Sequence, residues 1–399
     1  MKYICVCMLL LLFSCKRELY SSEESIKIKS DEAIRSSNQF AFNLYESIRE
    51  EKGNIFFSPF GLSVALTMTY MGASSLTKEQ MGKVLGIDSN NIHKSYGSLV
   101  AELNLTKDKG EIDFISLQHL WGEQQYPFSE SFVVALEKNY ESELTRLDFI
   151  NDAQNSRMVI NKWAEEGTNG KIKDLIPENL INSLTRLVLT NAIYFKGNWQ
   201  RPFDKKATKN MSFNISSSEK KEVAFMEKKD RVNYMEDELI QMVGIPFKGG
   251  DISFNMILPK KMDNLSGIEQ GMNSQVLDVW MGKMREQEVQ LIFPKINMEK
   301  SLQLKNILAN MGMPLAFSDD ADFSLMHKAG LKDLKISEVV HKAYIDVNEE
   351  GAEAAAASAV IMMTKSLSMP KVFFADHPFI FIIMDNKSKT ILFIGRFTN

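Results

Sequence analysis

Apolar residues in the first third of the chain recur at spacings of three and four, which is the periodicity of one face of a helix. This pattern predicts three helices, over Glu32–Glu51, Pro59–Met71 and Thr77–Leu85. Ser58 followed by Pro59 is typical of a helix start, because serine caps the free N–H groups and proline suits the first turn. Thr77 followed by Gln80 predicts a capping box at the third helix.

Later in the chain the pattern changes to short β-branched or aromatic runs bounded by turn residues. Such runs predict five strands, over Leu187–Phe195, Ile252–Leu258, Glu288–Phe293, Phe379–Met384 and Thr390–Ile394. Helices and strands interleave without a regular strand–helix–strand repeat, which indicates an α+β fold with a large, mainly antiparallel sheet. No linker-like segment interrupts residues 32–399, so we expect a single domain there.

The first residues differ in character from everything that follows. Lys2 precedes an apolar run from Tyr3 to Phe13, which is too short to span a bilayer and is typical of a secretory signal. The residues before Cys15 resemble the lipobox of bacterial lipoproteins, in which the cysteine is lipidated after cleavage. We therefore expect a signal peptide over residues 1–14 and a lipidated N-terminus and polar tether over residues 15–31. The protein would then be exported and anchored at the cell surface or in the periplasm; an ordinary signal peptide and secretion are the alternative.

Composition and charge exclude several functions. The chain of 399 residues carries 47 basic and 51 acidic side chains, a net charge of −4 that argues against nucleic-acid binding. Its three cysteines, Cys5, Cys7 and Cys15, all precede the predicted domain, which excludes a disulfide framework, a cysteine metal site and a catalytic thiol there. The five histidines lack metal-ligand spacing, and no nucleophile elbow or phosphate loop is found. We expect neither enzymatic activity nor a metal or cofactor.

One segment, from Glu349 to Leu367, breaks local rules. Its four consecutive alanines favour a helix, whereas the following valine and isoleucine favour a strand. At a period of two, one set of positions is small or apolar throughout: Ala352, Ala354, Ala356, Ser358, Val360 and Met362. Such alternation would let the segment lie as a strand with one buried face, so an ordinary surface helix and a two-state element both stay open. The bond between Lys365 and Ser366 suits a protease whose specificity pocket carries an aspartate.

Many short motifs, in order along the chain, carry a resemblance to a known family. They include Asn54–Pro59, Thr168–Ile172, Asn191–Trp199, Phe293–Lys295, Ala321–Ser324, His341–Ala343, Ala375–Phe381 and Leu392–Arg396. Through them the chain resembles the serpins, a family of serine protease inhibitors, from about Asp31 to Asn399. The resemblance implies the serpin fold, with helices packed around a large sheet, further sheets and an exposed reactive-centre loop at about residues 349–370.

The resemblance also implies a function. Members inhibit serine proteases as suicide substrates: the loop is cleaved, an acyl-enzyme forms, and the loop inserts into the central sheet. The hinge expected here contains Glu349, Gly351, Ala352, Ala354 and Ala356, and an uncharged residue at the position of Ala352 is typical of inhibitory members. The usual spacing from Glu349 places the reactive bond at Lys365–Ser366, which implies trypsin-like target proteases. Met362 and Met363 offer alternative scissile bonds for proteases that prefer large apolar residues.

Further implied sites lie away from the loop. Ser58, Asn191 and His341 are expected to form a buried hydrogen-bonded cluster at the main sheet, although Gly61 stands where the family usually has a second serine, whose hydroxyl a water could replace. Trp199 and Lys295 are expected in the region that releases the loop, with an ion pair between Lys295 and Glu349 as a hypothesis. We expect a monomer. The alternative function is a non-inhibitory serpin that serves as a surface-binding or structural lipoprotein.

Overall fold

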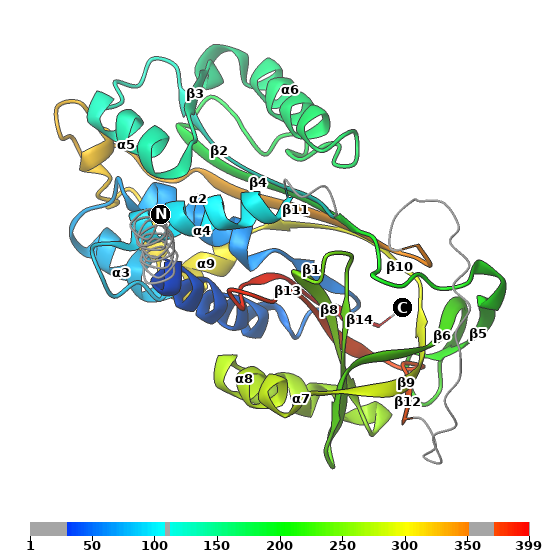
Figure 1. Ribbon diagram of the computed structural model, residues 1–399. Coiled ribbons are helices and arrows are strands. Elements are labelled where there is room, and N and C mark those ends of the chain that lie inside the picture. Colours follow the sequence, from blue (N-terminus) through cyan, green and yellow to red (C-terminus); the bar gives the residue numbers. More distant parts are fainter. Residues whose placement is uncertain (1–29, 108–111, 351–370, 399) are drawn as a thin grey trace, which may run out of the picture.

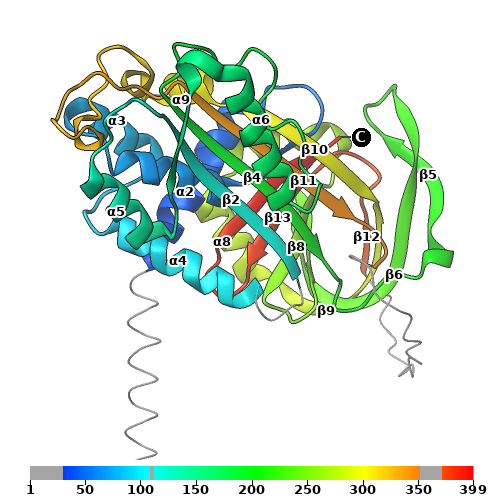
Figure 2. The same ribbon diagram turned by 90° about the horizontal axis from the view of Figure 1, so that it is seen from above.

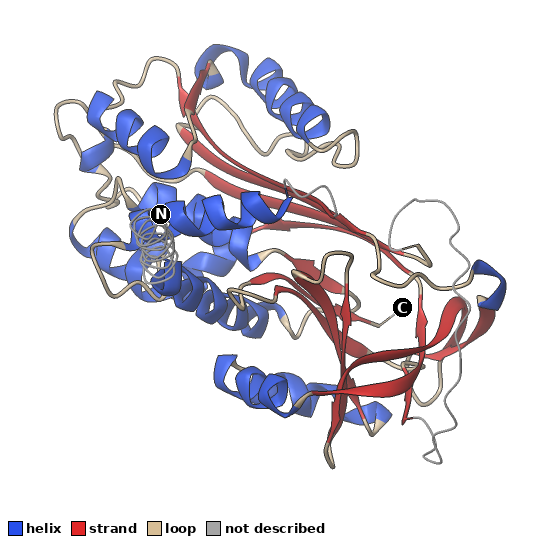
Figure 3. Cartoon of the chain, in the orientation of Figure 1, coloured by secondary structure: helices blue, strands red, loops and turns tan. Residues whose placement is uncertain are grey.

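The computed structural model describes residues 30–107, 112–350 and 371–398 of the chain (Figure 1). Two sheets organise these residues. Helices gather at the end where the described chain begins, and the strands of the larger sheet lie at the opposite end (Figure 3). The α+β expectation is confirmed.

A five-stranded sheet has the spatial order β10-β11-β4-β2-β3. Antiparallel pairings of β10 with β11 and of β4 with β2 flank a parallel pairing of β11 with β4, and β3 adds a second parallel pair with β2 at the edge. Strand β4 is buried along nearly its whole length, because helices cover one face and the main core covers the other. The strands are β2 (Ile112–Glu123), β3 (Leu144–Leu147), β4 (Leu187–Gly197), β10 (Ile296–Gln303) and β11 (Glu338–Val347).

The larger sheet is mainly antiparallel, with the order β1-β14-β13-β8-β7-β6-β9-β12 and β5 paired to β6. Its one parallel pair, β12 with β9, returns the chain to the sheet after the segment that follows Glu350. The strands are β1 (Ile55–Phe57), β5 (Lys209–Asn214), β6 (Lys220–Glu236), β7 (Ile240–Pro246), β8 (Ile252–Pro259), β9 (Arg285–Pro294), β12 (Lys371–Phe374), β13 (Phe379–Asp385) and β14 (Ile391–Phe397).

Helices cover both sheets. A helix over residues 30–48 begins the described chain, and α6 lies across β2, β4 and β11 (Figure 2). The others are α2 (Pro59–Tyr70), α3 (Ser75–Leu85), α4 (Ile92–Lys107), α5 (Glu130–Tyr140), α6 (Phe149–Gly167), α7 (Leu265–Gly271), α8 (Ser274–Lys283) and α9 (Lys305–Met311), with 3₁₀ turns η1 (Lys205–Ala207), η2 (Met262–Asn264), η3 (Pro314–Phe317) and η4 (Ser324–Met326).

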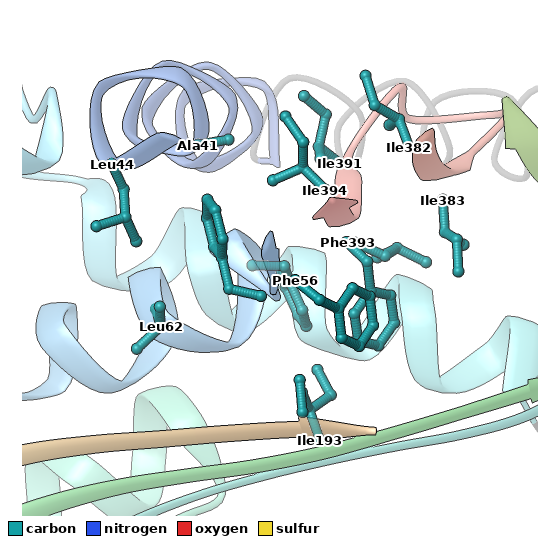
Figure 4. Packing of buried hydrophobic residues seen from close by; sticks show 14 of the residues in the cluster. Ala41, Leu44, Phe56, Leu62, Ile193, Ile382, Ile383, Ile391, Phe393 and Ile394 are labelled. Atoms are coloured by element: carbon teal, nitrogen blue, oxygen red, sulfur yellow. The ribbon is translucent and has the colours of Figure 1, made fainter. Parts of the chain in front are cut away.

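The main core joins the two sheets. Phe56 of β1 stacks on Phe393 of β14 with ring centroids 5.2 Å apart, and Ile193 of β4 points toward these rings from the five-stranded sheet (Figure 4). A second, smaller cluster lies between α6 and the outer face of the five-stranded sheet and includes Trp121, Ile160 and Val340. Helix α6 is therefore held on this sheet by its own apolar contact area.

The predicted capping box is wrong, although all three helices form. Helix α3 begins at Ser75, two residues before the predicted start, so Thr77 lies inside the helix. The Thr77 hydroxyl instead accepts the N–H of Asp322 at 2.9 Å, and Oε1 of Gln80 accepts the N–H of Leu315 at 3.1 Å. Both side chains are used for tertiary contacts that the local sequence pattern cannot reveal.

Candidate functional site

The seam between β11 and β4 is the central feature of the five-stranded sheet. Glu338–Ile345 pair in parallel register with Val188–Phe195, and His341 lies opposite Asn191. The chain leaves β11 at Val347, at the same end of the sheet as the last residues of β4. Asn348, Glu349 and Glu350, which we call the stem, follow at once.

Ser58, Asn191 and His341 meet in a buried hydrogen-bonded cluster beneath this seam. The Ser58 N–H donates to Nε2 of His341 at 3.2 Å, which leaves the ring proton on Nδ1, facing Oδ1 of Asn191 at 2.6 Å. Asn191 donates in turn to the Leu117 carbonyl at 3.1 Å, and the Ser58 hydroxyl donates to the Leu392 carbonyl at 2.6 Å. Burial lowers the pKa of His341 to about 3, because a protonated ring would lose its hydration. The cluster therefore contains a neutral imidazole.

The side chain of Asn191 fills the space beside Gly61. A Cβ atom at position 61 would lie 2.6 Å from Nδ2 and 2.8 Å from Oδ1 of Asn191. The departure from the family's serine thus leaves the carboxamide packed directly against the backbone of α2. The contact does not depend on a water in place of the missing hydroxyl.

The stem is held by the segment that follows β4. Trp199 donates its indole N–H to the Asn348 carbonyl at 2.8 Å and its backbone N–H to the Glu350 carbonyl at 3.2 Å. The Phe203 N–H donates to the Glu349 carbonyl at 2.7 Å. Each carbonyl of the stem therefore has a donor.

Aromatic packing fixes Trp199 in place. Its ring is buried and stacks on Phe247 with a centroid separation of 4.7 Å, and the edges of Phe254 and Phe293 close the pocket. An indole held this rigidly presents its N–H in one direction only, so Trp199 acts as a fixed donor to the stem.

Glu349 has two side-chain partners. Its carboxylate accepts the Thr208 hydroxyl at 2.7 Å and pairs with the ammonium of Lys295 at 2.9 Å. Burial opposes ionisation of this carboxylate, but the hydrogen bonds from Lys295 and Thr208 outweigh it and hold the pKa of Glu349 below its ordinary value. The pair between Lys295 and Glu349 that the sequence suggested as a hypothesis is present.

Glu350 pairs with Lys205, a residue that sequence reasoning missed. Lys205 opens η1, and Asp204 caps this turn by accepting the Lys206 N–H at 2.9 Å. An Asp before a short polar run indicates such a turn, but nothing in the sequence places it beside residues near position 350. The remaining expected residues lie outside the described part of the chain: Cys15, Gly351, Ala352, Ala354, Ala356, Met362, Met363, Lys365 and Ser366.

The described residues contain no group of three or more His, Cys, Asp or Glu side chains suited to hold a metal ion. None of the helices within residues 30–107, 112–350 and 371–398 is both long and apolar enough to cross a membrane.

The fold and the seam define the class of protein. The model of the serpin family, described as serine protease inhibitors, matches residues 35–399, and the chain belongs to this family. It is 38% identical to Serpin B6 of Macaca fascicularis, covering 92% of this chain and 100% of that protein. It is also 38% identical to the leukocyte elastase inhibitor of Xenopus laevis, with coverages of 90% and 97%.

Solved structures agree with this assignment. Uncleaved ovalbumin matches with a TM-score of 0.83 at 28% identity, over 91% of this chain and 98% of the other. Maspin matches with a TM-score of 0.85 at 27% identity, over 93% and 99%. The serpin fold is confirmed. The sequence relatives named above are eukaryotic proteins and give no support to the bacterial lipoprotein type expected from the first residues.

Proposed function

We propose that the protein inhibits trypsin-like serine proteases by trapping them after cleavage at Lys365–Ser366. The observation that carries this proposal is the parallel pairing of β11 with β4 next to a stem that leaves β11 at the open end of their seam. A strand inserted there would run opposite to β11 and therefore also opposite to β4. It would convert one parallel pairing into two antiparallel ones, whose ladders are slightly more stable per residue.

The chemical step belongs to the protease. Its serine oxygen attacks the carbonyl carbon of Lys365, and the bond from this carbon to the nitrogen of Ser366 breaks. The serine proton passes through the protease histidine to the new amino group of Ser366. An ester then links Lys365 to the protease, and hydrolysis of this ester would release a cleaved, inactive inhibitor.

Trapping requires insertion to be faster than that hydrolysis. The alternating small residues from Ala352 to Met362 suit a strand that must enter between existing strands with one face buried. The N–H groups of Trp199 and Phe203 donate to the carbonyls of the stem and keep it in place until cleavage frees the loop. Helix α6 and its apolar cluster lie over the sheet, so β11 and β4 must separate beneath it.

The test is incubation of the full chain with trypsin. We expect a covalent complex that survives SDS electrophoresis, and we expect Lys365→Glu to abolish it, because the aspartate of the trypsin pocket repels a carboxylate. Lys371→Glu, a change of the same charge outside the predicted bond, is the matched control. An undiminished complex with Lys365→Glu would contradict the assigned bond. Loop cleavage without any complex would favour the non-inhibitory alternative.

A second target class has support from the loop and from a relative. Met362 and Met363 precede the proposed bond, and a relative bears the name leukocyte elastase inhibitor. Mass spectrometry of the peptide released by an elastase-type protease would show whether cleavage follows one of these methionines. Release only after Lys365 would exclude the second site.

Export with lipidation at Cys15 is also proposed. The family match begins at residue 35, so the apolar run and the cysteine precede the shared domain. An acylated N-terminus would hold the inhibitor near a membrane surface through the tether over residues 15–31.

A further inference from the structure

The turn η1 directs two consecutive contacts at the stem. Lys205 at its start pairs with Glu350, and Thr208 just after it binds Glu349. The two glutamates are nevertheless held differently. The Glu349 side chain is 7% exposed and has two side-chain partners, whereas that of Glu350 is 25% exposed and its partner Lys205 is 66% exposed. The side chain of Glu349 is thus tightly held, whereas the ion pair of Glu350 is accessible to water and salt.

Insertion requires the chain to reverse direction at this point. β11 ends at Val347, so a strand that runs back between β11 and β4 must turn within the residues that immediately follow. A turn that begins at Glu350 takes its carbonyl away from the Trp199 N–H and its carboxylate away from Lys205. The ion pair to Lys205 then belongs to the state before insertion, and such a turn breaks it.

We propose that Lys205 is a positioning residue that slows loop insertion by holding Glu350 in the position it occupies before cleavage. This inference rests on the proposed trapping mechanism. Lys205 would then act on the rate of insertion, and this rate relative to that of ester hydrolysis sets how much protease is trapped. Because the pair is largely exposed, added salt weakens it, so ionic strength becomes a control of the same balance.

The test compares Lys205→Met with Lys206→Met. Lys206 is the adjacent exposed lysine, and it forms no ion pair with the described residues of the stem. Under saturating trypsin, the limiting rate of covalent complex formation should rise about two- to fivefold in Lys205→Met, the range that an exposed ion pair supports. The number of inhibitor molecules consumed per trapped protease should fall. Lys206→Met should match wild type in both measurements.

A charge exchange separates the pair from other effects of Lys205. Glu350→Lys alone should insert faster than wild type, and the double change Lys205→Glu with Glu350→Lys should return the rate toward wild type. Raising the salt concentration from low to high should speed insertion in wild type and leave Lys205→Met nearly unchanged. Thermal unfolding of each variant before protease addition shows that it is folded.

The outcomes distinguish the two proposals. If wild type forms no complex and its melting temperature does not rise after loop cleavage, the trapping mechanism is wrong and the role of Lys205 falls with it. If wild type traps trypsin but Lys205→Met inserts at the rate of wild type and of Lys206→Met, only the role of Lys205 is wrong. Failure of the charge exchange to restore the rate would also overturn it.

Discussion

Asn191 shows how one side chain couples a helix to two strands. It contacts Gly61 of α2, faces His341 of β11 and donates to Leu117 of β2. Oδ1 faces His341, Nδ2 donates to Leu117, and both atoms lie against Gly61, so a change at any neighbour disturbs the others.

Restoring the family's serine at position 61 should therefore destabilise this protein. In Gly61→Ser, the new Cβ would lie 2.6 Å from Nδ2 of Asn191, which must rotate and give up a buried hydrogen bond. We expect a loss of about 1–3 kcal/mol in the free energy of unfolding, measured by urea denaturation. Gly282→Ser is the control, because nothing lies within 4 Å of a Cβ there. A variant as stable as wild type would show that Asn191 is not fixed against α2.

His341 gives a pH dependence with a definite sign. Its pKa is about 3 in the folded chain and 6.5 when unperturbed, so the unfolded chain binds more protons between these values. The stability contributed by the neutral ring is complete above pH 6.5 and is lost as the pH falls toward 3. His341→Gln should flatten the fall in unfolding free energy over this range. The flattening is partial, because burial also lowers the pKa values of His93 and His119 to about 4.

At the scale of elements, the predicted hinge must enter the seam as a strand. Ala352→Arg would place a charge on the face that becomes buried, and an unpaired buried charge opposes insertion. We expect the variant to be cleaved by trypsin as fast as wild type but to leave the protease active. Glu353→Arg, on the opposite face of the alternation, is the matched control. Equal yields of covalent complex from Ala352→Arg and wild type would contradict the insertion argument.

The strands differ in whether the local sequence pattern is sufficient to predict them. Strands such as β8 and β13 are buried on both faces and read as continuous apolar runs, so the sequence predicted them. β6 is a long strand rich in lysine and glutamate, and it was not predicted. It is a strand because β9 and β7 supply its hydrogen bonds, a reason that no local window contains.

For the whole molecule, the parallel pairing of β11 with β4 predicts that the native state is metastable until a strand is inserted between them. We expect the melting temperature to rise by tens of degrees after the loop is cleaved within residues 351–370, because the inserted strand would add a full set of ladder hydrogen bonds. Calorimetry before and after cleavage measures the shift. A serpin with the same fold but no insertion would keep its original melting temperature.

The proposed lipid anchor at Cys15 would decide where the whole molecule is located. In a host that processes lipoproteins, Cys15→Ser should move the protein from the membrane fraction to the soluble fraction. Cys7→Ser is the matched control, since residues 1–14 are expected to be removed. Mass spectrometry of the mature N-terminus would show the acyl chains. A wild-type protein found only in the soluble fraction would exclude the anchor.

The sequence by itself determined the α+β class, three of the helices, five of the strands, and the motifs that identify the serpin family. These depend on hydrophobic periodicity and local residue types, which are readable along the chain. Tertiary structure decided that Asn191 fills the space beside Gly61, that Thr77 and Gln80 bind distant backbone groups, and that Lys205 pairs with Glu350. Such contacts join residues more than a hundred positions apart, and their geometry follows from how the two sheets pack.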